Sequence, residues 1–132
     1  MQLVEDGTAA IVKGDLCIIR AGKFKKITAT GDAGPYVVAV EATAKSATGR
    51  AIIDGIVDMD EGNDGALTLG DLLIPSGTTL GDVKKATTTD YSSNNSQAVF
   101  REIRLQIGMA YEAIAKDATG RVLLEYRAGL SD

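Results

Sequence analysis

The sequence predicts an all-β protein built from two related halves. Three observations support this: short apolar runs alternate with polar turns, 15 glycines mark many chain reversals, and a long segment occurs twice. Trp is absent and Phe occurs only twice, so the core must consist mainly of Val, Ile, Leu and Ala. A chain of 132 residues is long enough to bury such a core. We therefore expect a single domain over residues 1–132.

The repeat is the strongest internal pattern. Residues 39–53 (AVEATAKSATGRAII) and 110–124 (AYEAIAKDATGRVLL) are identical at nine of fifteen positions. Upstream, KGDLCII at 13–19 matches LGDLLIP at 69–75, and each is followed by a Lys-Lys pair. Two matches in the same order indicate a duplicated unit. The predicted halves are 7–57 and 65–127, joined by a polar link at 58–64.

Each half has the same predicted order of elements. A Gly-Asp turn leads into an apolar strand, then a Lys- and Thr-rich strand, a variable stretch, an Ala-rich segment, an ATGR turn and a final apolar strand. Residues 101–109 alternate apolar with polar side chains, and 36–40 and 51–53 are rich in β-branched residues, as strands are. The Ala-rich segments at 42–45 and 113–116 are too short to form stable helices.

The charge pattern disfavours a nucleic-acid partner. The net charge is −4 and the pI is about 4.8, whereas affinity for phosphates depends on Lys and Arg. Lys23, Lys25 and Lys26 form the nearest basic cluster, which we interpret as a solvated edge strand. Apolar runs are far shorter than a membrane span, and the N-terminus lacks the features of a secretory leader. We expect a soluble protein with no membrane partner.

The residue types present do not indicate catalysis. The chain has no His, which removes the usual general base and a common metal ligand. The acidic cluster at 58–64 has no apparent means of burial, and it lacks the Glu at the twelfth position that a calcium loop needs. We therefore predict a protein that is not an enzyme and that has no catalytic residues, cofactor or metal.

Two further features have ordinary structural interpretations. Arg50 and Arg121 follow Gly-containing turns and could suggest anion binding, but the spacing of a phosphate-binding loop is absent. A duplicated hairpin turn explains both copies. Cys17 lies in the apolar run Leu16–Ile19 and is expected to be a small core residue without redox function.

The sequence resembles a family of capsid cement, or head decoration, proteins of tailed bacteriophages. The resemblance covers about residues 14–127 and rests on the GDL entries, GPYVVAVEATA, GRAIIDGIVD, GDLLIPSG and IGMAYEAIAKDATGRVLLEYR. It implies a compact β-barrel or β-tulip-like body that binds the outer surface of the capsid and stabilises it. It further implies a homotrimer at local threefold positions, the major capsid protein as partner, and a location on the virion after assembly in the host cytoplasm.

The resemblance also suggests where contacts to the capsid lie, because the family's contacts are generally assigned to an N-terminal arm and surface loops. The matching arm candidates are Met1, Gln2, Leu3, Val4, Glu5 and Asp6. The loop candidates are Asp90, Tyr91, Asn94 and Asn95, in a polar excursion at 90–97. Residues 1–6 could instead be the first strand of the protein's own sheet, and this alternative stays open at the level of sequence.

Two other functions are compatible with a small β domain. One is a module on the virion surface that recognises a carbohydrate or a host molecule, for which Tyr91 is the evident exposed aromatic residue. The other is a non-catalytic subunit of a larger enzyme with a β-clip-type body.

Overall fold

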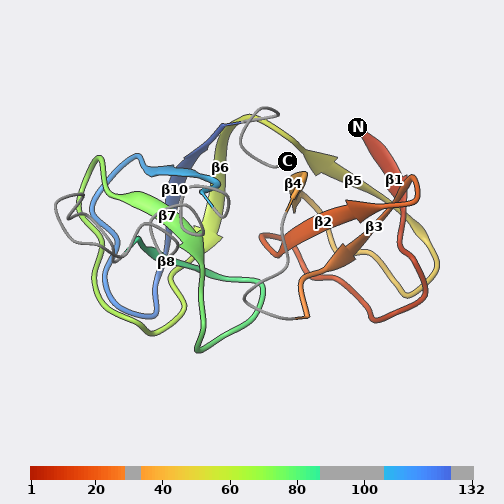
Figure 1. Cartoon of the computed structure of the whole chain (residues 1–132), viewed down its shortest axis with the longest axis horizontal. Helices are drawn as coiled ribbons and strands as arrows, with labels where there is room; N and C mark the ends of the chain where they lie inside the picture. The colour runs from red at the N-terminus through yellow and green to blue at the C-terminus, as the bar shows by residue number, and fades with distance from the viewer. Residues whose placement is uncertain (29–33, 87–105, 126–132) are drawn as a thin grey trace, which may run out of the picture.

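The protein consists of two antiparallel five-stranded sheets that lie side by side along the long axis (Figure 1). This is a computed structural model, and it describes residues 1–28, 34–86 and 106–125. The described residues form strands and no helix, which confirms the all-β prediction, and none of them belongs to a helix that could span a membrane. The two edge strands of each sheet do not pair along their length to close a barrel, so the predicted barrel is not confirmed.

The first sheet has the strand order β1-β5-β4-β2-β3. Its strands are β1 (Gln2–Val4), β2 (Leu16–Arg20), β3 (Lys23–Lys26), β4 (Tyr36–Ala39) and β5 (Thr48–Ile52). The edge strand β3 buries Phe24 and exposes Lys23. The Lys-rich segment is therefore an edge strand, as predicted, and its charged side chains discourage pairing with other chains.

The second sheet has the order β6-β10-β9-β7-β8, which is the order of the first sheet with every strand replaced by its repeat equivalent. Its strands are β6 (Gly55–Asp60), β7 (Leu72–Pro75), β8 (Val83–Lys85), β9 (Gly108–Ala110) and β10 (Thr119–Leu124). Single parallel bridges join the two edges of each sheet at corresponding places, Glu5 to Phe24 and Glu61 to Val83. The duplicated sequence is thus also a duplicated topology.

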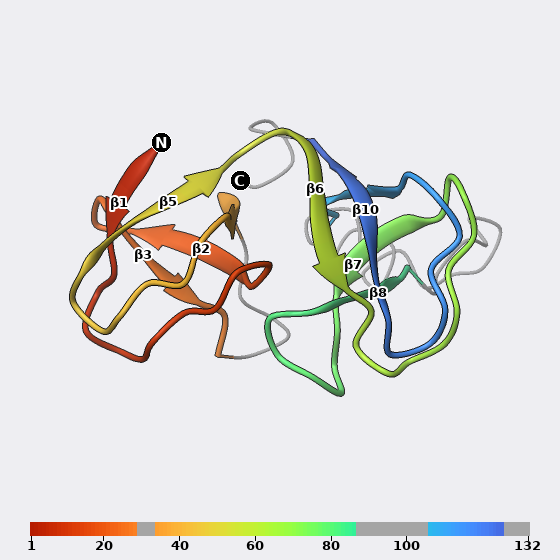
Figure 2. The ribbon, with the colours of Figure 1, turned by 180° about the vertical axis from the view of Figure 1, so that it is seen from behind.

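The predicted polar link at 58–64 is not a separate connection. Residues 58–60 are the end of β6 and pair with β10, and the chain crosses between the sheets earlier, at Ile53 and Asp54 (Figure 2). Asp58 and Asp60 point outward while Met59 between them is buried. A strand with one solvent-exposed face carries its charged residues at alternate positions, so the acidic residues at 58 and 60 belong to a strand and do not mark a linker.

The two ATGR segments are strand starts and not turns. Thr48–Arg50 belongs to β5, and the tight turn precedes it, where the Ala47 N–H donates to the Ala44 carbonyl at 3.0 Å. Ser46 in this turn has a φ of 63°, and Asp117 in the second copy has 59°. Gly49 is needed for close packing, because a Cβ there would overlap the Thr43 side chain.

Two apolar clusters hold the molecule together. The smaller lies within the first half, around Cys17, Phe24 and Val37. The larger contains residues of both halves, among them Leu16 and Leu73. A buried Leu or Ile contributes about 1.5–3 kcal/mol relative to an exposed one, so the larger cluster also ties the two sheets to each other.

Candidate functional site

The N-terminal arm predicted from the resemblance is the first strand of the protein's own sheet. Gln2–Val4 pairs antiparallel with β5, and the N-terminal ammonium donates to the Ala51 carbonyl at 2.8 Å. Strand β1 is at the end of the strand order, and on its side away from β5 the chain meets β3 through a single bridge, between Glu5 and Phe24. Gln2 and Val4 are exposed, whereas Glu5 is buried. Residues 1–6 could be a free arm or the first strand of the protein's own sheet, and in the structure Gln2–Val4 is that first strand.

Glu5 closes the turn that follows β1 with its carboxylate. Its Oε1 accepts the N–H groups of Gly7 at 2.7 Å and Ser46 at 2.8 Å, and its Oε2 accepts those of Thr8 and Ala9 at 3.1 and 3.2 Å. Burial raises the pKa of the Glu5 carboxyl, but the backbone N–H donors outweigh burial and lower the pKa from 4.5 to about 2. Both oxygens of the carboxylate accept hydrogen bonds from the protein's own backbone, so Glu5 has a structural role.

Glu61 forms the same arrangement in the second half. It is fully buried, and its carboxylate accepts the N–H groups of Asn63, Asp64, Gly65 and Asp117 at 2.7–3.2 Å. The sequence-based expectation that nothing buries the acidic residues at 58–64 is therefore wrong for Glu61. Backbone donors offset the cost of burying a charge, and they are not visible in side-chain patterns.

A second acidic pair closes the two Gly-Asp turns. The Asp15 Oδ2 accepts the Val12 N–H at 3.0 Å, and its Oδ1 lies 3.4 Å from the Lys26 ammonium. In the second half Asp71 does the same with the Thr68 N–H at 2.9 Å and with Lys85 at 3.4 Å. These contacts account for the Lys-Lys pair that follows the GD turn in each half, although the β7–β8 loop is longer than the β2–β3 turn.

The two arginines considered as anion-binding residues have internal partners. The Arg50 guanidinium donates to the Glu41 carboxylate at 3.1 and 3.3 Å, and Arg121 donates to Glu112 at 3.0 and 3.2 Å. The Arg121 guanidinium also lies over the Tyr111 ring at 5.8 Å from its centroid. In each pair two guanidinium nitrogens donate to the same carboxylate oxygen, Oε2, and this charged partner competes with any added anion, which disfavours phosphate binding.

Cys17 is fully buried in the first sheet. Burial, with a smaller contribution from the Asp15 carboxylate, raises the pKa of the Cys17 thiol to about 12. Because the thiolate is the reactive form, this thiol is inert at neutral pH. The prediction of a core cysteine is confirmed.

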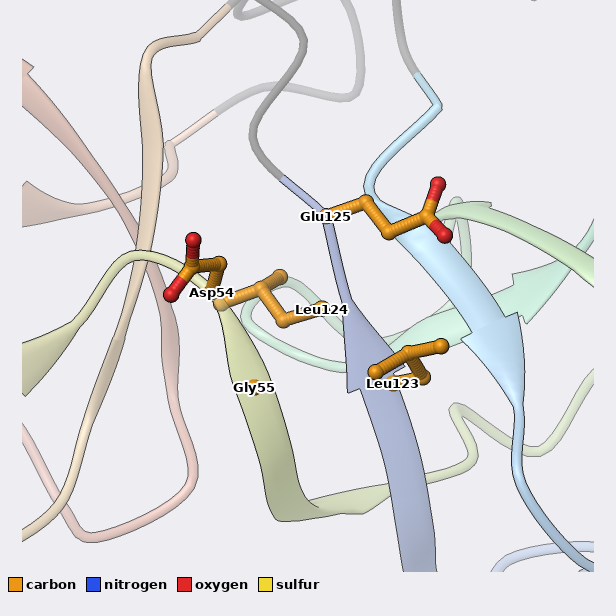
Figure 3. Close-up of a pocket in the computed structure, with 5 residues that line it drawn as sticks. All are labelled: Asp54, Gly55, Leu123, Leu124 and Glu125. Atoms are coloured by element: carbon orange, nitrogen blue, oxygen red, sulfur yellow. The ribbon is translucent and has the colours of Figure 1, made fainter.

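A shallow open depression of about 450 Å³ lies where β5 crosses to β6. It is lined by Asp54, Gly55, Leu123, Leu124 and Glu125. Figure 3 shows the carboxylates of Asp54 and Glu125 pointing away from each other, so they do not form a pair. Within residues 1–28, 34–86 and 106–125, no three metal-ligating side chains come together.

The predicted loop contacts Asp90, Tyr91, Asn94 and Asn95 lie outside the described residues. Sequence reasoning missed the two carboxylate-closed turns around Glu5 and Glu61. An extended comparison of the halves would have found them, because Glu5 precedes Asp15 by the same number of residues as Glu61 precedes Asp71.

Comparisons with known proteins support the fold. No protein-family model and no curated protein matches the sequence. Among solved structures, the chain is similar to the head fiber gp8.5 N base of bacteriophage phi29, with a TM-score of 0.64 and 12% sequence identity. The match covers 96% of this chain and 94% of that chain. At this identity the likeness establishes that the two proteins share an all-β fold over nearly their whole length.

Proposed function

We propose that this protein is a structural component of a tailed-phage virion that binds the outer surface of the capsid and stabilises it, as a trimer at local threefold positions. The observation that carries the proposal is the fold shared with the phi29 head fiber base, a phage head protein, across nearly the whole of both chains. The resemblance of the sequence to capsid decoration proteins is a second line of support from different evidence.

The internal contacts fit a mechanical and non-enzymatic role. The buried carboxylates of Glu5 and Glu61 accept bonds from the backbone, and the Arg50 and Arg121 guanidinium groups have carboxylate partners. These interactions hold turns in place. They also engage the carboxylate and guanidinium groups that a catalytic site would need free to contact a substrate. A rigid body repeated many times on a shell can stabilise it through many weak contacts, because multivalent contacts add.

The N-terminal strand is the proposed capsid contact. Gln2 and Val4 are exposed on an edge strand, and an edge can accept a strand from another protein. Asp90, Tyr91, Asn94 and Asn95, which the sequence predicts to be loop residues, are the second proposed contact.

The test is binding to expanded capsids that lack this protein, produced from the genome that encodes it. Purified protein at micromolar concentration is expected to co-sediment with these capsids and to raise the temperature at which they release DNA. The variant Val4→Asp should weaken co-sedimentation, while Lys45→Ala, at an exposed turn in the first half, should not. No binding by the wild-type protein would refute the proposal.

A further inference from the structure

One face of the first sheet is covered by the second half of the same chain. On this face Leu16 and Val38 are fully buried, in the cluster that contains residues of both halves. The Leu16 N–H donates to the carbonyl of Gly81, in the loop between β7 and β8, at 2.8 Å, and this loop extends toward the first sheet (Figure 2). A Cβ on Gly14 would lie 3.4 Å from the Asp58 carbonyl of β6. Strand β6 and this loop thus form the cover.

The second sheet repeats this face but leaves it open. The strand register aligns Leu72 with Met109, Met109 with Leu123, and Leu123 with Ile56, so the four side chains form one row across β7, β9, β10 and β6. Leu72 takes the place of Leu16 in the repeat, yet Leu72 is 39% exposed and Leu16 is 0% exposed. Ile56, at the other end of the row, is 50% exposed.

The turn beside this row is also open in the second half. Gly70 corresponds to Gly14, but a Cβ on Gly70 would meet no heavy atom within 4 Å. Leu69, next to it, is 69% exposed. We call the surface formed by Ile56, Leu69, Leu72, Met109 and Leu123 the distal face.

The first half contains the equivalents of the covering elements. In the repeat β1 corresponds to β6, and the turn at Ala21 and Gly22 corresponds to the loop that ends at Gly81. A Cβ on Gly22 would meet nothing within 4 Å, whereas one on Gly81 would contact Lys26 and Asp15 of the first half. The first half thus presents an uncovered version of the surface that the second half uses. We call β1 with this turn the leading surface. Since β1 is also the proposed capsid contact, the β1 of any one copy can make only one of the two contacts.

We propose that the distal face of one chain binds the leading surface of a second copy of this chain, head to tail. The arrangement would repeat between chains the contact already made within the chain. The charges at the two surfaces are complementary, since the leading turn is flanked by basic residues and one end of the distal row by an exposed acidic one. These are Arg20, Lys23 and Lys25 on one side, and Asp54, which lines a depression together with Leu123, on the other.

The contact between chains differs from the internal one in one respect. The β2–β3 turn is shorter than the β7–β8 loop, so the bond that Gly81 makes to Leu16 is not expected to recur. The intermolecular contact therefore rests on the apolar row and the charges. A head-to-tail contact uses two different surfaces, so it either closes into a ring or extends as a chain.

The first experiment measures the mass of purified wild-type protein by sedimentation equilibrium, from low micromolar to near-millimolar concentration, without capsids. We expect concentration-dependent association. Leu72→Asp and the more exposed Leu69→Asp should each weaken it about tenfold or more, because a charge replaces an apolar contact. The control Val12→Asp changes a residue of the first half that is 58% exposed and should leave association unchanged. A wild-type protein that stays monomeric would overturn the proposal, as would two distal variants that associate normally.

The second experiment tests the head-to-tail geometry. Leu72→Asp keeps an intact leading surface, and Lys23→Glu keeps an intact distal face. Each variant alone should associate weakly, and their mixture should form a one-to-one pair. Absence of the pair would overturn the head-to-tail contact. Neither measurement involves a capsid, so the head-to-tail contact can fail while binding to the capsid holds, and the two failures are distinguishable.

Discussion

Replacing Glu61 with Gln tests whether the buried carboxylate holds the second half together. The carboxylate accepts four backbone N–H groups: those of Asn63 and Asp117 at Oε1, and those of Asp64 and Gly65 at Oε2. A Gln amide keeps one acceptor oxygen and places an NH₂ group where the other oxygen was. Two backbone donors then face a donor, and the other two lose a charged acceptor.

The cost follows from these bonds. Each buried donor that loses its acceptor costs about 1–3 kcal/mol. Asn63 and Asp64 are exposed, so water can partly replace the lost acceptor, and the lower end of the range applies. We expect Glu61→Gln to lower the free energy of unfolding by about 3 kcal/mol. For a chain of this length, that corresponds to a fall in Tm of roughly 9–15 °C.

The assay is thermal and urea unfolding at pH 7, followed by circular dichroism. Glu5→Gln should cause a loss of similar size, because Glu5 makes the equivalent set of bonds. Glu112→Gln is the matched control at an exposed carboxylate and should have a much smaller effect. A Glu61→Gln protein that melts within about 2 °C of the wild type would refute the reasoning.

Acid titration gives an independent check at Glu5. The folded-state pKa of about 2 lies below the ordinary value of 4.5, so the folded state binds this proton less readily than the unfolded chain. The stabilisation is therefore complete above pH 4.5 and is lost as the pH falls toward 2. Wild type and Glu5→Gln should differ in stability at pH 7 and converge at the acid end. A difference that does not depend on pH would contradict the assignment.

Three further substitutions should have defined effects. Thr43→Val should raise stability by about 1 kcal/mol in urea unfolding, because the buried Thr43 Oγ1 has no hydrogen-bond partner. Gly120→Ala should lower stability by about 2–4 kcal/mol, since a Cβ there would overlap the Ile114 side chain, and a neutral result would contradict the packing. Asp82→Asn should stabilise the protein at pH 7 and not at pH 4, because burial and then the Asp60 carboxylate raise the Asp82 pKa to about 6. Parallel melts at the two pH values test this, and equal shifts would refute it.

The fold was predictable because its cause lies in local patterns. Alternation of apolar with polar residues indicates strands without reference to the rest of the chain, and the repeat at 39–53 and 110–124 predicts that both halves fold alike. The GD turns before Leu16 and Leu72 could be found in the same way, since each combines a glycine of positive φ with a short polar side chain.

The features that were not predicted depend on contacts between distant segments. Glu61 is buried because the backbone of residues 63–65 and Asp117 surrounds it, and no side-chain pattern records those N–H groups. The sequence pattern predicts a turn at Gly49. In the structure Gly49 lies in a strand, and a larger residue would overlap the Thr43 side chain that packs against it. Whether Leu16 or Leu72 is covered depends on how the halves dock, which their shared sequence pattern cannot distinguish.

The burial of Cys17 has a practical consequence. The chain has one cysteine, and its thiol is fully enclosed with a pKa of about 12. A maleimide reagent at neutral pH should therefore leave the native protein unmodified. A cysteine introduced at an exposed position such as Val12 would carry a fluorophore or spin label at one known point, without removal of the natural thiol.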